Sequence, residues 1–206
     1  MSPPLNVYAI VDAAPSVEVR GAAGEPVRAV RSGALFALAG EVDAPPELTA
    51  ESLRAHDAAV RRLVEICPAL LPVRFGSILA DGVDFSGREV ELREALELVR
   101  GREQMTLRVY GEASAPDRES GTAYMESLRR ARAVPALDPL RTALSALVHA
   151  ERTEPHGGAL VASVYHLIDR GKAAEYLRAV EGTALTVRVA ASGPWPAWSF
   201  APEALR

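Results

Sequence analysis

The chain has 206 residues, of which 49% are hydrophobic and 24% are charged, and its formal net charge is −4. This composition is ordinary for a globular protein that buries its core in one large domain or two small ones, and the lack of a long basic block argues against nucleic acid as the main partner. The single cysteine, Cys67, excludes an intramolecular disulfide and a multi-cysteine zinc site. Residues 1–8 do not read as a signal peptide, and no apolar stretch reaches the ~20 residues of a membrane span, so we expect a cytoplasmic protein without a lipid-membrane partner.

The first third of the sequence predicts a strand, a hairpin and a long helix. Residues 7–12 read as a buried strand. Residues 27–40 read as a hairpin that turns at Ser32-Gly33, because Ser-Gly between two apolar runs is typical of a turn. Residues 49–67 have the apolar spacing of a helix, with Thr49 as its N-cap.

The next run, residues 70–76, reads as an apolar strand with a single charge, Arg74. An arginine between Val73 and Phe75 either points to water from an edge strand or enters an apolar neighbourhood, where it requires a carboxylate partner. We predict the second arrangement, a buried or semi-buried ion pair, and take Arg74 and Phe75 as candidate structural or interaction residues. His56 is a third candidate, at the border of the apolar stripe of the preceding helix, where a packed structural histidine is favoured over a catalytic one.

A capped helix and an alternating strand follow. Ser86 and Glu89 have the spacing of a capping box, so we predict a helix that begins there and runs to about residue 100. Residues 104–110 alternate apolar and polar side chains, which predicts a half-buried strand. The polar residues 112–119 then predict a linker.

The second half of the chain continues the alternation of helices and strands. Helices are predicted over 120–134, from Asp138 to about 148 and over 172–180, and strands over 159–168 and 185–189. The sequence M-T-L-R-V at 105–109 is similar to L-T-V-R-V at 185–189, which leaves open whether the two halves share one architecture. The pattern indicates α+β sandwiches, in which helices cover one face of a sheet.

No residue pattern predicts catalysis, a metal site or a bound cofactor. The glycine-rich phosphate loops, the zinc-binding H-E-x-x-H and the G-x-S-x-G elbow are all absent. The four histidines are dispersed, and Cys67 lies on an apolar helix face, which is the wrong setting for a nucleophile. We expect no enzyme and no cofactor; an enzyme that uses His56 and Arg74 with a nearby carboxylate stays as a less favoured alternative.

The C-terminal stretch holds three of the few aromatic residues of the chain, Trp195, Trp198 and Phe200. Pro194 and Pro196 predict that this segment is extended. Its tryptophans either cover an open edge of the core, which we favour, or anchor another protein, because Trp is enriched at binding hot spots.

Three sequence blocks resemble the signatures of one protein family. They are L-P-V-R-F-G at 71–76, S-G-T-A-Y at 120–124 and G-P-W-P-x-W-S-F at 193–200, and their order and placement are similar to those of the gas vesicle protein GvpF/GvpL family. The second block adds Tyr124 to the interaction candidates. The resemblance implies an N-terminal domain with a modified ferredoxin-like fold and a C-terminal α+β, ferredoxin-like domain. With the linker at 112–119, the expected domains are residues 1–111 and residues 120–206, the latter including the aromatic tail.

The resemblance also implies a non-enzymatic accessory role in building gas vesicles, the protein-walled buoyancy organelles. Members of this family are thought to bind the small hydrophobic shell protein, which an exposed sheet edge can do by strand addition. We therefore expect as partners the major gas vesicle shell protein and other gas vesicle accessory proteins, and a cytoplasmic, gas vesicle associated location. A ligand-binding regulatory module of ferredoxin-like architecture remains the alternative.

Overall fold

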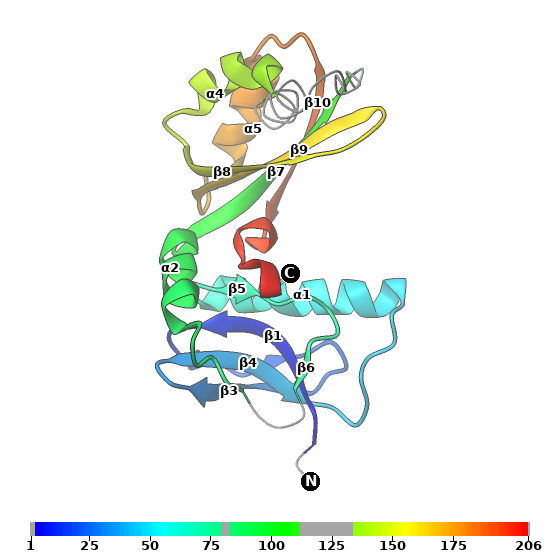
Figure 1. Ribbon diagram of the computed structural model, residues 1–206, viewed down its shortest axis with the longest axis vertical. Coiled ribbons are helices and arrows are strands. Elements are labelled where there is room, and N and C mark those ends of the chain that lie inside the picture. Colours follow the sequence, from blue (N-terminus) through cyan, green and yellow to red (C-terminus); the bar gives the residue numbers. More distant parts are fainter. Residues whose placement is uncertain (1–2, 80–82, 112–133, 206) are drawn as a thin grey trace, which may run out of the picture. The chain divides into compact units, whose positions relative to one another are not determined.

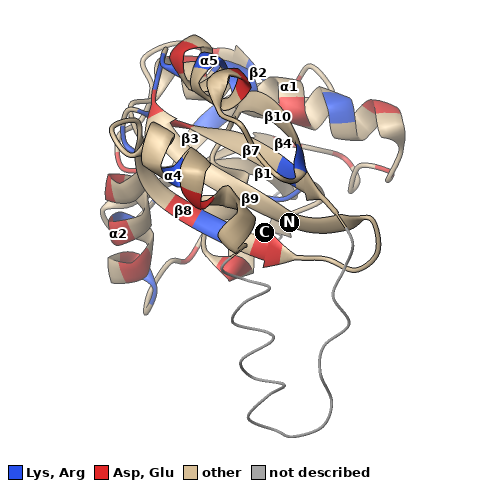
Figure 2. Ribbon diagram, turned by 90° about the horizontal axis from the view of Figure 1, so that it is seen from above, with Lys and Arg blue, Asp and Glu red and all other residues tan. Residues whose placement is uncertain are grey.

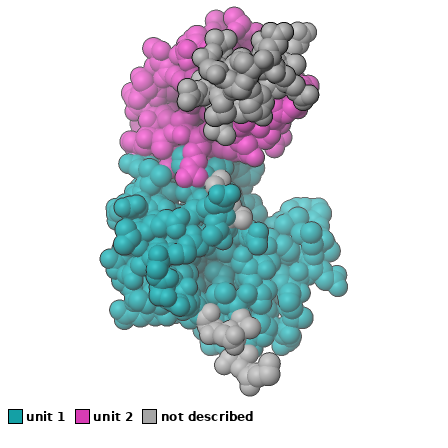
Figure 3. All heavy atoms as spheres, viewed as in Figure 1, with its two compact units in different colours: residues 1–102, 195–206 teal, residues 103–194 magenta. Residues whose placement is uncertain are grey.

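The computed structural model describes residues 3–79, 83–111 and 134–205. The chain forms two compact units, residues 1–102 with 195–206 and residues 103–194 (Figure 3). Each unit contains one sheet with helices packed on it (Figure 1). The predicted α+β class with two domains is therefore confirmed.

The first unit is built around strand β1 (Leu5–Val11), which lies inside a sheet with the order β2-β3-β4-β1-β5. The other strands are β2 (Val19–Arg20), β3 (Pro26–Ser32), β4 (Leu35–Glu41), β5 (Leu71–Pro72) and β6 (Ile78–Leu79), the last of which also pairs with β1. Side chains of β1 are buried on both faces of the sheet, as its continuous apolar sequence predicts. The predicted hairpin is also confirmed, because β3 and β4 turn at Gly33, which has a φ of 62°.

Helix α1 (Ala50–Ile66) covers one face of this sheet, against β1 and β2. Its predicted N-cap is present: the side chain of Thr49 accepts a hydrogen bond from the backbone N–H of Ser52. The helix buries a stripe formed by His56, Ala59, Val60 and Leu63. Acidic and basic residues are mixed along its outer side (Figure 2), so this helix presents no like-charge block.

Two predicted features of the first unit differ in the structure. The capping box at Ser86 and Glu89 is wrong: α2 (Glu89–Val99) begins after Arg88 without a side-chain cap. Ser86 instead donates from its N–H and its hydroxyl to the carboxylate of Asp84, at 2.8 and 2.9 Å, because an aspartate two residues earlier offers a closer acceptor. The strand expected over 70–76 is reduced to the two residues of β5, and a separate short strand, β6, follows after the left-handed Gly76 (φ 79°); both are antiparallel to β1.

The second unit has a four-stranded sheet with the order β10-β7-β9-β8. Its elements are β7 (Arg102–Tyr110), a 3-10 turn (Pro135–Leu137), α4 (Asp138–Leu144), β8 (Val148–Pro155), β9 (Leu160–Asp169), α5 (Ala173–Gly182) and β10 (Arg188–Trp195). A strand, a helical connection, two strands, a helix and a last strand in this spatial order make the ferredoxin-like topology. The core joins β7 and β9 to the helices, with Leu107, Val164, Leu140, Leu144 and Tyr176 all buried.

The sequence did not predict β8, which begins at Val148, where the expected helix was to end; α4 stops at Leu144 and a turn at 145–147 leads into the strand. Within the described part of the chain this strand pairs with β9 alone, and most of its residues are exposed. An edge strand with polar residues on both faces lacks the alternation that identifies a strand. The similar sequences at 105–109 and 185–189 do not mark equivalent places in two halves, because β7 and β10 are neighbours in one sheet and β10 begins only at Arg188. The helix expected over 120–134 and the linker at 112–119 lie outside the described residues.

The bounds of the two units differ from the expected domains 1–111 and 120–206. Strand β7 belongs to the second unit, because Met105, Leu107 and Val109 are buried in the core of that unit. The C-terminal residues 195–206 belong to the first unit, where the backbone N–H of Arg74 donates to the carbonyl of Leu205 at 2.8 Å. The predicted extended form of this segment is also wrong beyond Trp195, since 198–200 and 203–205 are 3-10 turns, η2 and η3.

Candidate functional site

Four rings from distant parts of the chain meet in the first unit, and we call them the aromatic cluster: Tyr8, His56, Phe75 and Trp198. The ring of Tyr8 stacks on His56 with 5.0 Å between centroids, and Phe75 meets His56 edge-on at 5.6 Å. Trp198 lies tilted at 6.1 Å from His56. A strand, a helix, the loop after β5 and the C-terminal turn η2 each contribute one ring, so the cluster ties these elements together.

His56 is the centre of the aromatic cluster and is only 2% exposed. Its Nε2 lies 3.0 Å from the carbonyl oxygen of Val73, which can only accept, so Nε2 carries the hydrogen. Burial lowers the pKa of His56, which favours the neutral ring. A neutral histidine that is packed between rings and bound to the backbone holds α1 to the chain after β5, and it has no open side for a substrate.

Arg74 does not form the predicted ion pair. Its side chain is exposed and makes no salt bridge to a residue that the structure describes. Val73 occupies the inward position, with its N–H bonded to the carbonyl of Tyr8 at 2.9 Å. Consecutive side chains of an extended segment point to opposite sides, so Arg74 is turned outward. His56 and Arg74 therefore do not form one site. Phe75, the neighbour of Arg74, does contact His56 as part of the aromatic cluster.

The C-terminal segment places its three aromatic side chains in three different environments. Phe200 is fully buried, and Trp198 packs on the core through the aromatic cluster. Trp195 is 36% exposed, and the guanidinium of Arg61 lies 4.6 Å from the centre of its ring. Tyr124, the remaining candidate, lies outside the part of the chain that the structure describes.

Beside the aromatic cluster, the hydroxyl of Tyr8 is the centre of a polar network. It accepts hydrogen bonds from the side chain of Asn6 at 2.9 Å and from the N–H of Ala22 at 2.8 Å, and it donates to the carboxylate of Glu25. Burial and the Glu25 carboxylate raise the pKa of Tyr8 to about 12, so this hydroxyl keeps its proton. The sequence analysis missed this network, although a glycine inside the β4 strand, Gly40, marks the place: a Cβ there would overlap Glu25.

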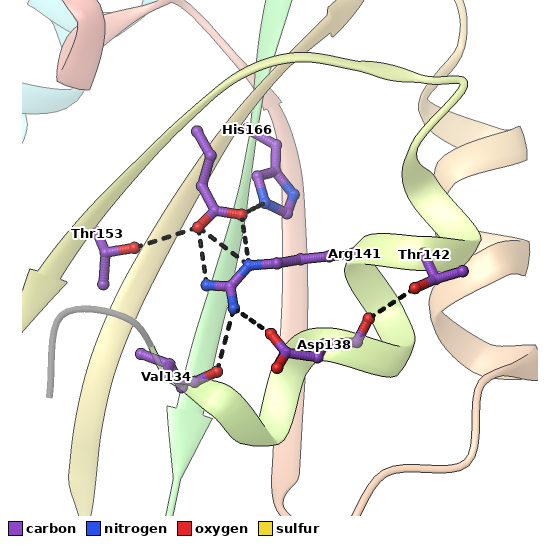
Figure 4. A network of polar contacts seen from close by, with 7 residues as sticks. Val134, Asp138, Arg141, Thr142, Thr153 and His166 are labelled. Carbon is purple, nitrogen blue, oxygen red and sulfur yellow. Dashed lines mark hydrogen bonds and ion pairs between the residues drawn. The ribbon is translucent and has the colours of Figure 1, made fainter. Parts of the chain in front are cut away.

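A second network, around Glu151, holds together the strands and helices of the second unit (Figure 4). Arg141 of α4 donates to the Glu151 carboxylate, from Nη2 at 2.8 Å and from Nε at 3.1 Å. His166 of β9 donates from Nε2 at 3.0 Å, and its Nδ1 is 2.7 Å from the hydroxyl of Tyr176 of α5. The bond from His166, followed by those from Arg141, lowers the pKa of Glu151 to about 2.

This chain of polar groups resembles a proton relay, but its accessibility argues for a structural role. His166 is 2% exposed and Tyr176 is completely buried, so neither can touch a substrate. The two members that reach the surface, Glu151 and Arg141, have side chains that are 29% and 28% exposed, and they are already bonded to each other. No sequence pattern could have identified the network, since its four residues come from four elements and β8 was not predicted.

Neither network has the composition of a metal site, and no three His, Cys, Asp or Glu side chains among the described residues are arranged to hold a metal ion. The described helices are all too short or too polar to cross a membrane. A hollow of about 440 Å³ lies in the second unit. It is lined by side chains of α5, of the segment after α5 and of β10, among them Leu177, Val180, Leu185 and Val189.

Comparison with known proteins matches nearly the whole chain to one protein family. The model of the family described as gas vesicle synthesis protein GvpL/GvpF matches residues 5–202. Gas vesicle protein L of Streptomyces sp. (strain CB03234) is 28% identical over 229 aligned positions, which cover 88% of this chain and 85% of that protein.

Two solved structures have a similar fold. The crystal structure of the gas vesicle protein GvpF from Microcystis aeruginosa has a TM-score of 0.76 and 16% identity, covering 98% of this chain and 100% of that chain. That of GvpF from Anabaena sp. PCC7120 has a TM-score of 0.69 and 16% identity, covering 98% of this chain and 97% of that chain. At this level of identity, the likeness is one of fold alone.

Proposed function

Because this chain belongs to the GvpL/GvpF family of gas vesicle synthesis proteins, we propose that it is a non-enzymatic accessory protein of gas vesicle assembly. Its main partner is the hydrophobic major shell protein, which it shields before assembly or accompanies into the vesicle wall, and other gas vesicle accessory proteins are further partners. It acts in the cytoplasm, associated with gas vesicles. The observation that carries this proposal is the family match over residues 5–202, which spans both units.

The polar networks support a role without catalysis. The two histidines at the centres of the aromatic cluster and of the Glu151 network, His56 and His166, are each 2% exposed. Their ring nitrogens bond to the carbonyl of Val73 and to the carboxylate of Glu151, which fixes neighbouring elements to each other. Of the titratable side chains near the surface around them, Arg74 is exposed and Glu151 is held by bonds from Arg141 and His166. Such an arrangement stabilises a rigid scaffold, and a scaffold acts through its surfaces.

The sheets support a role in binding a polypeptide. Counting the described strands, each sheet ends in a strand with a neighbour on one side, and a strand edge of this kind pairs with an extended peptide through main-chain hydrogen bonds. We place the binding surface in the N-terminal domain, whose sheet has the more apolar strands. The aromatic residues Trp195 and Trp198 are additional anchor candidates in the same unit, whereas Phe200 is buried.

Co-purification tests this proposal. The tagged chain is expressed with the major shell protein, and the complex is isolated from the soluble fraction; we expect the shell protein to be retained and to aggregate without the chain. A strain that lacks the chain should form few or no vesicles. Failure to retain the shell protein, together with normal vesicles in the deletion strain, would reject the proposal.

One observation favours the second candidate function, a ligand-binding regulatory module. The hollow of about 440 Å³ beside α5 is within the size range of small-molecule pockets, and six of the eight residues that line it are apolar, with Glu181 and Thr183 as the polar ones. A thermal-shift screen with apolar and amphipathic metabolites checks this candidate. A ligand that raises the melting temperature of the wild type, but not that of a Val189→Glu variant, would support it.

A further inference from the structure

One edge of the first sheet is open along most of β3. Strand β2 pairs with the first two residues of β3, so among the described strands residues 28–32 have β4 as their only neighbour. Two loop residues join β3 and β4, so the pair that flanks the loop, Ser32 and Leu35, is hydrogen-bonded. Hydrogen-bonded and non-hydrogen-bonded pairs alternate along an antiparallel ladder, so Val30 and Arg28 also bond to β4, whereas Arg31 and Ala29 do not. The N–H and C=O groups of Ala29 and Arg31 therefore point outward, and they have no backbone partner among the described residues.

A hollow of about 190 Å³ lies beside this open edge. It is lined by Leu5, Pro26, Arg28, Val30, Ala39 and Glu41. Three of these are alternate residues of β3, so they face the same side of the sheet; the others come from β4, which pairs with β3, and from β1, the strand beyond β4 (Figure 1). A strand added along β3 would place every second side chain on this same side.

The two charged side chains of residues 28–32, Arg28 and Arg31, are both positive. Arg28 has a side chain that is 71% exposed and stands 3.7 Å from Glu41, an exposed pair that contributes little. Arg31 is exposed, and its Nε donates to the carbonyl of Gly33 rather than to a carboxylate. Charged residues on an edge strand hinder pairing with unmatched strands. The same arginines favour a strand that carries a carboxylate at the facing position.

We propose that the open edge of β3 receives an extended segment of the gas vesicle shell protein by antiparallel strand addition. The segment bonds to the outward groups of Ala29 and Arg31, places an apolar side chain opposite Val30 over the hollow, and has a carboxylate two residues later, opposite Arg28. Because β2 covers the edge at residues 26 and 27, the open part begins at residue 28. The added segment is therefore about five residues long, or ~17 Å. This inference rests on the proposed function and specifies the surface that performs it.

Two measurements test the edge with overlapping synthetic peptides that cover the major shell protein. In the first, amide hydrogen exchange of the free chain is compared with that of the chain saturated with the tightest peptide. The N–H groups of Ala29 and Arg31 should become protected in the complex, while the inward N–H of Val30 is slow in both states. A peptide that binds without protecting these two groups would overturn the inference.

In the second measurement, peptide affinity is determined for matched variants. Ala29→Pro removes an outward N–H and no bond of the sheet, so we expect the fold to persist and the affinity to fall about tenfold. Ala29→Ser keeps the N–H and should bind as the wild type does. Arg28→Glu should weaken binding by a further comparable factor, whereas Arg178→Glu, an equal charge change on the exposed side of α5, should not.

The outcomes separate the inference from the function on which it rests. If the chain retains the whole shell protein, and Ala29→Pro with an unchanged melting temperature retains it equally well, then the edge assignment is wrong and the proposed function stands. If no shell peptide and no whole shell protein binds, both are wrong. Protection of Ala29 and Arg31 that grows with the concentration of the chain itself would assign the edge to a second copy, and this too would overturn the inference.

Discussion

Replacing Glu151 by glutamine tests whether charge, rather than shape, holds the second unit together. Glutamine has nearly the same size, but Arg141 and His166 then donate to a neutral oxygen. The pKa of Glu151 falls from 4.5 to about 2, with the bond from His166 as the largest cause. At about 1.4 kcal/mol per pKa unit, this fall corresponds to roughly 3 kcal/mol. Because the side chain is 29% exposed, solvent screens part of it, and we expect Glu151→Gln to cost about 2 kcal/mol at pH 7.

The dependence on pH distinguishes this electrostatic effect from a packing defect. The pKa of Glu151 is lower in the folded state than in the unfolded state, so its stabilisation is complete above the unfolded value of about 4.5 and is lost as the pH falls toward about 2. The difference between the wild type and Glu151→Gln should therefore be full at pH 7 and about half as large near pH 3.

Native-state hydrogen exchange at the buried amides of β9 measures this difference, since it reports the stability of the second unit separately. Glu154→Gln is the matched control, on the same strand, with an exposed carboxylate that accepts one bond from Tyr165; its effect should stay within about 0.5 kcal/mol. A loss that is equal at pH 7 and pH 3, or below about 0.5 kcal/mol at pH 7, would refute the reasoning.

Three further substitutions test the first unit by urea denaturation. Gly40→Ala should cost about 1–3 kcal/mol, because the added Cβ would displace Glu25 from its bond with Tyr8. Gly157→Ala is the control and should be neutral, because no atom lies within 4 Å of the added Cβ. Equal urea midpoints for the two variants would contradict this prediction. Trp198→Ala should cost about 2 kcal/mol, since the half-buried ring packs on the core, and an unchanged midpoint would mean that this ring serves binding alone. Arg74→Leu should change the free energy of unfolding by no more than about 0.5 kcal/mol, because the side chain is exposed. A loss above about 1 kcal/mol would support the ion pair that the sequence predicts.

Local chemistry explains why several elements were predictable from the sequence. The Thr49 cap, the Gly33 turn and the apolar run of β1 each depend on residues within a few positions of one another. The prediction failed where two local partners compete, as when Asp84 takes the hydroxyl of Ser86 away from the expected capping box. It also failed at β8, whose identity as a strand comes from its pairing with β9 and not from its own alternation.

The sequence by itself determined the class of fold, the family resemblance and the turns and caps that divide the chain, because these depend on short-range spacing and on recurrent motifs. Only the tertiary structure decided that the C-terminal aromatic residues return to the first unit, that Arg74 faces water, and that His166, Glu151, Arg141 and Tyr176 form one network. Each of these contacts joins residues from separate elements, and their approach is set by how sheets and helices pack, for which no short stretch of sequence carries the information.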